Sequence, residues 1–304
     1  MQIDLFPARS FHQVGRRNHQ EDARFPDSDQ SPADSRTFIV CDGVGGLAHG
    51  EIASSTVAHA IGEYMESMDL SQELDPHDFG TALAAANDSL RNFRNQSSGN
   101  MATTLTCVAF HAGGALCAHI GDSRIYQIRP GVGIIYRSND HSLVNSLVHS
   151  GVITPEEVEN HPQSNVITRC MGFIDNHLEE PSAAVINISD IQPDDYFFLC
   201  SDGVTAKISD KKLTEIISSD VSDEEKIEIL ATLSENSHDN NTAYLIHIDN
   251  VEGGEISDEN DIEPESPSQT KSLESPPDQI MEIHPLQPSH KNSISLFLKN
   301  IFRR

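Results

Sequence analysis

Short apolar runs separated by polar, glycine-containing turns dominate the first 250 residues of the chain. The runs at 37–41 and 196–200 are continuously apolar, which is typical of strands buried on both faces. Between 101 and 137, several strand-like runs follow one another at the spacing of hairpins, with glycine turns between them. Further strands are predicted near 184–188 and 242–248, so the pattern predicts a protein rich in β-structure.

Apolar residues at helical spacing interrupt these strands. In the clearest case Phe79, Leu83 and Leu90 fall on one face of a helix predicted at 78–93. Three more helices are predicted, at 51–68, 210–218 and 224–234. Because helices and strands do not alternate as in a parallel βαβ array, the order favours antiparallel sheets flanked by helices.

Two stretches of the chain, a charged loop and a long insertion, lie outside this pattern. The charged loop follows an opening strand predicted within 1–14, and it contains several candidate functional residues. The segment 151–172 is irregular, with one helix start at Thr154, and an insertion of this length beside strands is typical of a substrate-facing flap. A short helix is expected directly after Asp140-His141-Ser142.

The composition changes sharply after residue 250. We therefore predict one compact domain over 1–249, followed by a disordered, acidic, Ser/Pro-rich linker over 250–293. The last segment, 294–304, combines apolar and basic residues. It fits an amphipathic element that contacts a protein or a membrane surface, and it equally fits a frayed end.

Charge and cysteine content narrow the classes of function. A net charge of −27 and a pI near 4.7 argue against binding to nucleic acid, which requires basic surfaces. Five cysteines, none in a CxxC pair, predict buried free thiols rather than disulfides or a zinc site. Without a signal-like N-terminus or an apolar run of membrane-spanning length, we expect a cytoplasmic protein.

Acidic residues recur where apolar runs end. The five sites are Glu21-Asp22, Asp42-Gly43, Asp122, Asp202-Gly203 and Asp239-Asn240. Any single Asp-Gly pair is most simply explained as a turn. Repeated strand-end carboxylates are instead the oxygen ligands that Mg²⁺ and Mn²⁺ prefer, so a divalent metal site is predicted.

Six motifs occur in a fixed order along the chain: R-x-x-x-E-D, DGVGG, GDSR, DHS, CSDG and DN. As an ordered set, they resemble the metal-dependent type 2C family of serine/threonine protein phosphatases, in its bacterial form. The resemblance extends roughly from Phe11 to Ile248. It implies an α+β fold, a four-layer α/β/β/α sandwich of two antiparallel sheets flanked by helices, with a two-metal site at one edge.

The resemblance also implies a set of metal ligands. Asp42 matches the residue that bridges the two metals, while the carbonyl of Gly43 and the side chain of Glu21 match ligands of one of them. Asp202 and Asp239 match the ligands that complete the other. The implied cofactors are two Mn²⁺ or Mg²⁺ ions per site, with a third, weakly bound ion.

Three further residues receive roles from the resemblance. Asp22 matches a residue that orients water at the metals, and Asp122, with Asp202, matches the ligands of the weaker third ion. Arg17 matches the residue that holds the substrate phosphate, which makes Arg17 and Asp42 the implied catalytic residues. The segment 151–172 matches the variable flap of the family.

The implied reaction is hydrolysis of phosphoserine and phosphothreonine on proteins by a metal-activated water, a step in signal transduction. The implied partners are phosphorylated proteins and a cognate serine/threonine kinase, and the enzyme is expected to be a monomer. Two alternatives remain open: a non-catalytic scaffold that keeps the fold, and hydrolysis of a small phosphate ester. A cysteine-nucleophile phosphatase is disfavoured, since no thiol lies in a phosphate-cradling loop with an arginine.

The chain departs from the family pattern at two positions. Val44 follows the first Asp-Gly, where many eukaryotic members have a histidine that protonates the leaving group. His49 and His141 are the alternative donors that the sequence offers, next to protonation by water. Ala102 replaces a glycine, which should cost little beyond backbone freedom. All predicted ligands precede the tail, so the tail is expected to be dispensable for the chemistry.

Overall fold

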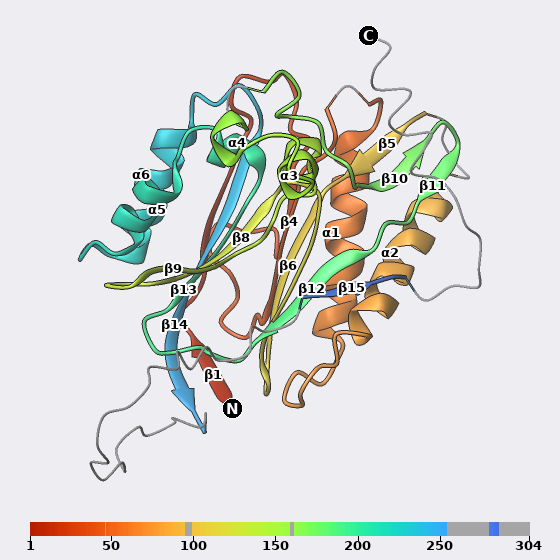
Figure 1. Cartoon of the computed structure of the whole chain (residues 1–304). Coiled ribbons are helices and arrows are strands. Elements are labelled where there is room, and N and C mark those ends of the chain that lie inside the picture. The colour runs from red at the N-terminus through yellow and green to blue at the C-terminus, as the bar shows by residue number, and fades with distance from the viewer. Residues whose placement is uncertain (46, 95–98, 159–160, 254–279, 286–304) are drawn as a thin grey trace, which may run out of the picture.

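Two antiparallel sheets pack face to face in the computed structural model, and helices cover both outer faces (Figure 1). The structure describes residues 1–45, 47–94, 99–158, 161–253 and 280–285. The four-layer sandwich predicted from the sequence is thereby confirmed.

Both sheets are antiparallel throughout. The first sheet has the order β1-β14-β13-β8-β9, with β2 also paired to β14, and its strands are β1 (Gln2–Leu5), β2 (Arg9–Gln13), β8 (Arg124–Arg129), β9 (Gly133–Arg137), β13 (Tyr196–Cys200) and β14 (Asn241–Glu252). The second sheet has the order β15-β12-β7-β6-β4-β3, and its strands are β3 (Ala23–Phe25), β4 (Thr37–Cys41), β6 (Leu105–His111), β7 (Gly114–Ile120), β12 (Ala183–Ile188) and β15 (Met281–Ile283).

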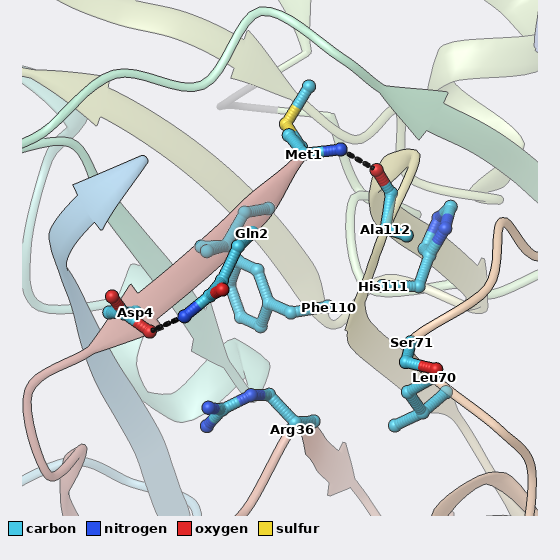
Figure 2. A pocket seen from close by; sticks show the side chains of 10 residues that line it. Met1, Gln2, Asp4, Arg36, Leu70, Ser71, Phe110, His111 and Ala112 are labelled. Atoms are coloured by element: carbon cyan, nitrogen blue, oxygen red, sulfur yellow. Dashed lines mark hydrogen bonds between the residues drawn. The ribbon is translucent and has the colours of Figure 1, made fainter. Parts of the chain in front are cut away.

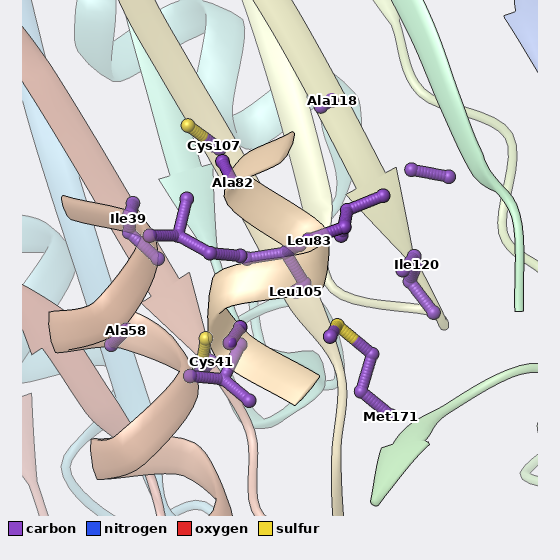
Figure 3. Close-up of a cluster of buried hydrophobic side chains, with 14 of the residues drawn as sticks. Ile39, Cys41, Ala58, Ala82, Leu83, Leu105, Cys107, Ala118, Ile120 and Met171 are labelled. Carbon is purple, nitrogen blue, oxygen red and sulfur yellow. The ribbon is translucent and has the colours of Figure 1, made fainter. Parts of the chain in front are cut away.

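Strand periodicity divides the apolar residues among three cores. In β4, Phe38 and Val40 face the first sheet, while Ile39 and Cys41 face the helices on the other side. This is why the run reads as continuously apolar in the sequence. Figure 3 shows the helix-facing core, in which Leu83 of a covering helix lies among side chains of the second sheet.

The four long helices match their predicted positions within a few residues. Helices α1 (Gly50–Glu66) and α2 (Asp78–Arg94) cover the second sheet, and α5 (Asp210–Ile217) and α6 (Asp223–Ser234) cover the first. Serine residues cap the latter pair: Ser209 Oγ accepts from Lys212 N at 3.3 Å, and Ser222 Oγ accepts from Glu225 N at 3.2 Å.

The segment between β9 and β12 is more ordered than the sequence indicates. The short helix α3 (Leu143–His149) begins after Ser142 as predicted, and the 3₁₀ turn η1 (Pro155–Glu157) lies at the predicted helix start. Strands β10 (Met171–Ile174) and β11 (His177–Glu179) form a small third sheet with β5 (Met101–Thr103), which the sequence did not predict. These strands have only three or four residues, too few for a clear pattern of alternation.

The predicted division at 249 stays a prediction, but the disorder predicted for 250–293 is wrong at the residues of this range that form strands. Strand β14 continues to Glu252, and β15 adds an edge to the second sheet with Ile283 buried in its core. A three-residue strand inside an acidic, Ser/Pro-rich stretch carries too little apolar signal to be recognised. The predicted amphipathic segment 294–304 lies outside the described residues.

Two further predictions concern the cysteines and the membrane. All five cysteines are free and buried, as predicted. In the described parts of the chain, the search for a helix of sufficient length and hydropathy to cross a bilayer found none.

Candidate metal centre

The predicted acidic residues gather where strands of both sheets end. Asp42 directly follows β4, Asp122 lies in the turn between β7 and β8, and Asp202 opens the one-turn helix α4 (Asp202–Thr205) after β13. In the first sheet Cys200 is the register partner of both Arg124 and Ala243, which brings the ends of β13, β8 and β14 together.

A buried asparagine joins the loops at this edge. Asn240 Oδ1 accepts from the backbone N of Glu21 at 2.8 Å, and Asn240 Nδ2 donates to the carbonyls of Val14 and His19 at 2.8 and 2.9 Å. The N-terminal charged loop is therefore fixed to the start of the last strand. The sequence pattern marks Asn240 only as the neighbour of Asp239, and its burial reveals the structural role.

The backbone at Asp42 and Gly43 is held from both sides. Thr104 Oγ1 accepts from Asp42 N at 3.0 Å, and Gly43 N donates to the carbonyl of Glu21 at 3.1 Å. A Cβ atom on Gly43 would lie 2.5 Å from that carbonyl oxygen and 2.6 Å from the carbonyl carbon of Gly50. Only glycine permits this close approach of the two acidic loops.

Crowding among these carboxylates changes their acidity. Burial, followed by the charges of Asp22 and Asp202, raises the pKa of Asp42 well above its ordinary value. Burial likewise raises the pKa of Asp22 to about 7 and that of Asp122 to about 8, and neighbouring acids add to each shift. Burial and the charge of Asp239 raise the pKa of Asp202. The charges of Arg124 on Asp122 and of Arg17 on Asp202 oppose these shifts but do not cancel them.

The donor set fits a hard divalent cation by its chemistry. Ser201 Oγ donates to Asp22 Oδ2 at 2.8 Å, but Asp22 Oδ1 and Asp202 Oδ1 are buried without a hydrogen-bond partner. Among the described residues, no three His, Cys, Asp or Glu side chains are already spaced to hold a metal ion.

Arg17 lies at the rim of this acidic cluster. Its Nη2 donates to Asp239 Oδ2 at 2.6 Å, and its guanidinium lies beside Gly45, where a Cβ atom would be 3.1 Å from Nη2. The side chain is 40% exposed, and hydrogen bonding to Asp239 raises its pKa. A fixed, solvent-facing guanidinium beside buried carboxylates is suited to an anionic ligand.

The histidines proposed as proton donors differ in their surroundings. Burial, then the charge of His119, lowers the pKa of His141 to about 2, and His141 Nδ1 accepts a hydrogen bond from Gly121 N at 3.1 Å. His141 is therefore neutral and structurally engaged, which disfavours it as the acid. His49 is half-buried near Glu51, at an Nδ1–Oε1 distance of 4.0 Å.

A separate pocket of about 400 Å³ lies at the opposite end of the second sheet, where β4 starts and β6 ends (Figure 2). The amino group of Met1 donates to the carbonyl of Ala112 there, at 2.5 Å. Its lining residues include Arg36 and His111 but none of the predicted metal ligands. This pocket is therefore distinct from the acidic cluster.

Comparison with known proteins connects this geometry to a family. The sequence profile described as protein phosphatase 2C matches residues 14–242. The chain belongs to the protein phosphatase 2C family. It is 35% identical over 216 residues to protein phosphatase PhpP of Streptococcus pneumoniae, an alignment that covers 69% of this chain and 85% of PhpP. Protein phosphatases are hydrolases, and this chain is a protein serine/threonine phosphatase of the 2C type.

Solved structures of 2C-type phosphatases support the same assignment. Serine/threonine phosphatase Stp1 from Staphylococcus aureus superimposes with a TM-score of 0.66 at 28% identity, covering 82% of this chain and 98% of that structure. The catalytic domain of PstP in complex with two manganese ions gives a TM-score of 0.64 at 26% identity, covering 81% and 99%. The family is metal-dependent, and one of its solved members holds manganese.

Proposed function

We propose that this phosphatase removes phosphate from phosphoserine and phosphothreonine on proteins at the acidic edge around Asp42, with two Mn²⁺ or Mg²⁺ ions bound. The observation that carries the proposal is the set of buried carboxylates whose pKa values are raised by burial and by one another, with Arg17 beside them. Such a set is stable in its ionised form only when cations balance it.

We assign the ligand roles from the positions of the motifs in the family pattern. Asp42, directly after β4, would contact both ions, with Glu21 and the Gly43 carbonyl holding one ion and Asp202 and Asp239 holding the other. Asp22, already hydrogen-bonded to Ser201, would orient water through its unpartnered oxygen. Asp122 would complete a weaker third position near Asp202, the neighbour whose charge most raises its pKa after burial.

The bound cations would supply a water of lowered pKa and would offset negative charge on the phosphoryl oxygens. Arg17 would hold two of those oxygens through its paired donors. To do so the guanidinium must share or exchange its bond to Asp239, which is possible because both side chains are partly exposed. Val44 cannot donate a proton, so water is the proposed source of the proton for the departing serine or threonine oxygen.

The substrate class implies a partner enzyme. Phosphoserine and phosphothreonine on proteins are made by kinases, so a serine/threonine kinase must supply the substrate. We propose that the phosphatase opposes such a kinase. The expectation of a monomer in the cytoplasm stays a prediction.

A phosphopeptide assay with purified full-length protein tests this function. Release of phosphate that requires Mn²⁺ or Mg²⁺ and stops in EDTA is the expected result. A scaffold that keeps the fold would release none with either metal. An enzyme for small esters would hydrolyse an alkyl phosphate well and the phosphopeptide poorly, which would contradict the proposed substrate class.

A further inference from the structure

The chain returns after β14 to add one more strand, β15, to the second sheet, beside β12 (Figure 1). The register pairs Ile283 with Ala183 and Met281 with Val185. Ile283 is 3% exposed and packs into the helix-facing core, whereas Glu282 and His284 face outward. This alternation fixes the strand by its apolar face and leaves Glu282 free to contact a neighbour.

Glu282 contacts the end of the predicted flap segment. Arg169 Nη1 donates to Glu282 Oε2 at 2.6 Å, and Ser182 Oγ donates to the same oxygen at 2.6 Å. Arg169 Nη1 also donates to Ser182 Oγ at 3.3 Å. Glu282 of β15, Ser182 directly before β12 and Arg169 shortly before β10 therefore form one hydrogen-bonded group.

The backbone next to Arg169 continues this connection toward the acidic cluster. Thr168 N donates to the carbonyl of His141 at 2.7 Å, and His141 N donates to the carbonyl of Gly121 at 2.8 Å. Gly121 N in turn donates to His141 Nδ1 at 3.1 Å. Gly121 immediately precedes Asp122, so two consecutive contacts, Thr168 to His141 and His141 to Gly121, lead from the neighbour of Arg169 to the neighbour of a predicted metal ligand.

Two further contacts support the connection. The rings of His119 and His141 stack at a centroid distance of 4.6 Å and an interplanar angle of 10°. Burial lowers the pKa of His119, the charge of Glu282 opposes that shift and the charge of Arg169 adds to it, so both charged groups lie within electrostatic reach of the stack. A Cβ atom on Gly121 would lie 2.7 Å from Thr104, the residue that accepts from Asp42 N.

We propose that residues 280–283 act as a strap that positions the turn carrying Asp122. Seated on β12, the strap holds Arg169 through Glu282, and Arg169 holds the 166–168 segment against His141 and thus against Gly121. Glu282 is a positioning residue, since it touches neither the substrate nor a predicted ligand. Release of the strap would loosen the Asp122 turn and weaken cation binding there.

Salt should weaken the ion pair of the strap but not its apolar contact with the core. The side chains of Glu282 and Arg169 are 47% and 32% exposed. An ion pair this exposed is weakened by salt, whereas the apolar seat of Ile283 is not. The two parts of the strap can therefore be tested separately.

The test uses three variants of the full-length chain. Ile283→Asp places a charge in the core and should unseat the strap, His284→Asp places the same charge on the adjacent, exposed position as the matched control, and Glu282→Gln removes the ion pair but leaves the strand. Hydrogen exchange of amides in 119–122 and 166–170 gives a readout that does not depend on turnover. Calorimetric titration with Mn²⁺ alone gives the affinity.

We expect faster exchange in both segments for Ile283→Asp and Glu282→Gln, and a loss of Mn²⁺ affinity of about tenfold. The KM for phosphopeptide should stay unchanged, and His284→Asp should behave as the wild type. Wild-type exchange and Mn²⁺ affinity in Glu282→Gln and Ile283→Asp would overturn the strap, as would equal effects in Ile283→Asp and His284→Asp. The activity arm rests on the proposed function. If the wild type releases no phosphate, that function fails while exchange and titration still decide the strap.

Discussion

Arg17 donates a hydrogen bond from Nη2 to Oδ2 of Asp239 at 2.6 Å. The residue predicted to hold the phosphate is thus paired with a residue predicted to bind metal. The pair keeps the guanidinium at the rim of the site before substrate arrives. It also means that substrate phosphate would replace Asp239 as the partner of Arg17, and metal would replace Arg17 as the partner of Asp239.

Replacing Arg17 should affect the phosphate more than the metal. We expect Arg17→Ala to raise the KM for phosphopeptide by about tenfold to a hundredfold, the value of losing charge-assisted hydrogen bonds. Because Asp239 loses its partner, the Mn²⁺ concentration for half-maximal activity should stay equal or fall. Steady-state kinetics at several Mn²⁺ concentrations checks both. A higher Mn²⁺ requirement at unchanged KM would contradict this role.

The acidic cluster should be essential for turnover but not for folding. Asp42→Asn and Asp239→Asn are expected to reduce phosphate release to near background, because each removes a predicted ligand. Asp34→Asn, at an exposed loop position, is the control and should keep wild-type activity. Circular dichroism verifies folding. Normal rates in both ligand variants would refute the metal assignment.

Above neutral pH, the metal-free protein should lose stability as the pH rises. The folded state raises the pKa of Asp22 from an ordinary 3.8 to about 7 and that of Asp122 to about 8. Through these two groups the folded chain binds more protons than the unfolded chain between pH 4 and pH 8, which lowers stability through that window. The lowered pKa of the buried His141 has the opposite effect below its ordinary value of 6.5, so the net fall is expected above that pH. Thermal melts in EDTA should show a lower Tm at pH 8 than at pH 7, and Mn²⁺ should reverse the fall at pH 8.

The matched variant for this pH effect is Asp122→Asn, which removes one of the two carboxyl groups with a raised pKa that are named above. In EDTA its Tm should depend less on pH than that of the wild type. A Tm that rises from pH 7 to pH 8 in the metal-free wild type would show that these carboxylates are not held in the crowded state described here.

The source of the proton for the leaving group can also be tested. Since Val44 cannot donate a proton and His141 is neutral and bonded to Gly121, turnover of aryl phosphates should fall steeply as the leaving-group pKa rises. Val44→His should flatten that dependence if its ring reaches the oxygen. A shallow slope in the wild type that steepens in His49→Ala would instead identify His49 as the acid.

Asn240 offers a prediction about the architecture of the site. Its amide bonds to Glu21 N, Val14 O and His19 O inside the protein, and Asn240→Ala would leave these groups without partners. We expect a loss of unfolding free energy of about 1 to 3 kcal/mol. Urea denaturation measures it. Ser71→Ala, at an exposed loop position, is the control, and equal midpoints in both variants would contradict the role of Asn240.

The sequence predicts the strands, the long helices and the positions of the acids because each leaves a periodic or repeated pattern. Asp42 and Asp202 both follow apolar runs, and the antiparallel registers bring such strand ends together. The bond between Arg17 and Asp239 could not be predicted, since no pattern states which side chains pair across 222 residues of chain. The placements of Glu282 and Asn240 were missed for the same reason, because both depend on tertiary contacts.

Strand β14 has a consequence for how the protein is made. It pairs with β1, β2 and β13, so the first two strands of the chain remain without their partner until the last long strand has been synthesised. Asn240, directly before β14, then closes the loop that contains Glu21, over a separation of 219 residues. Contacts this distant in sequence form late in folding. A nascent chain on the ribosome therefore has no assembled phosphatase site, and activity begins only when the domain is complete.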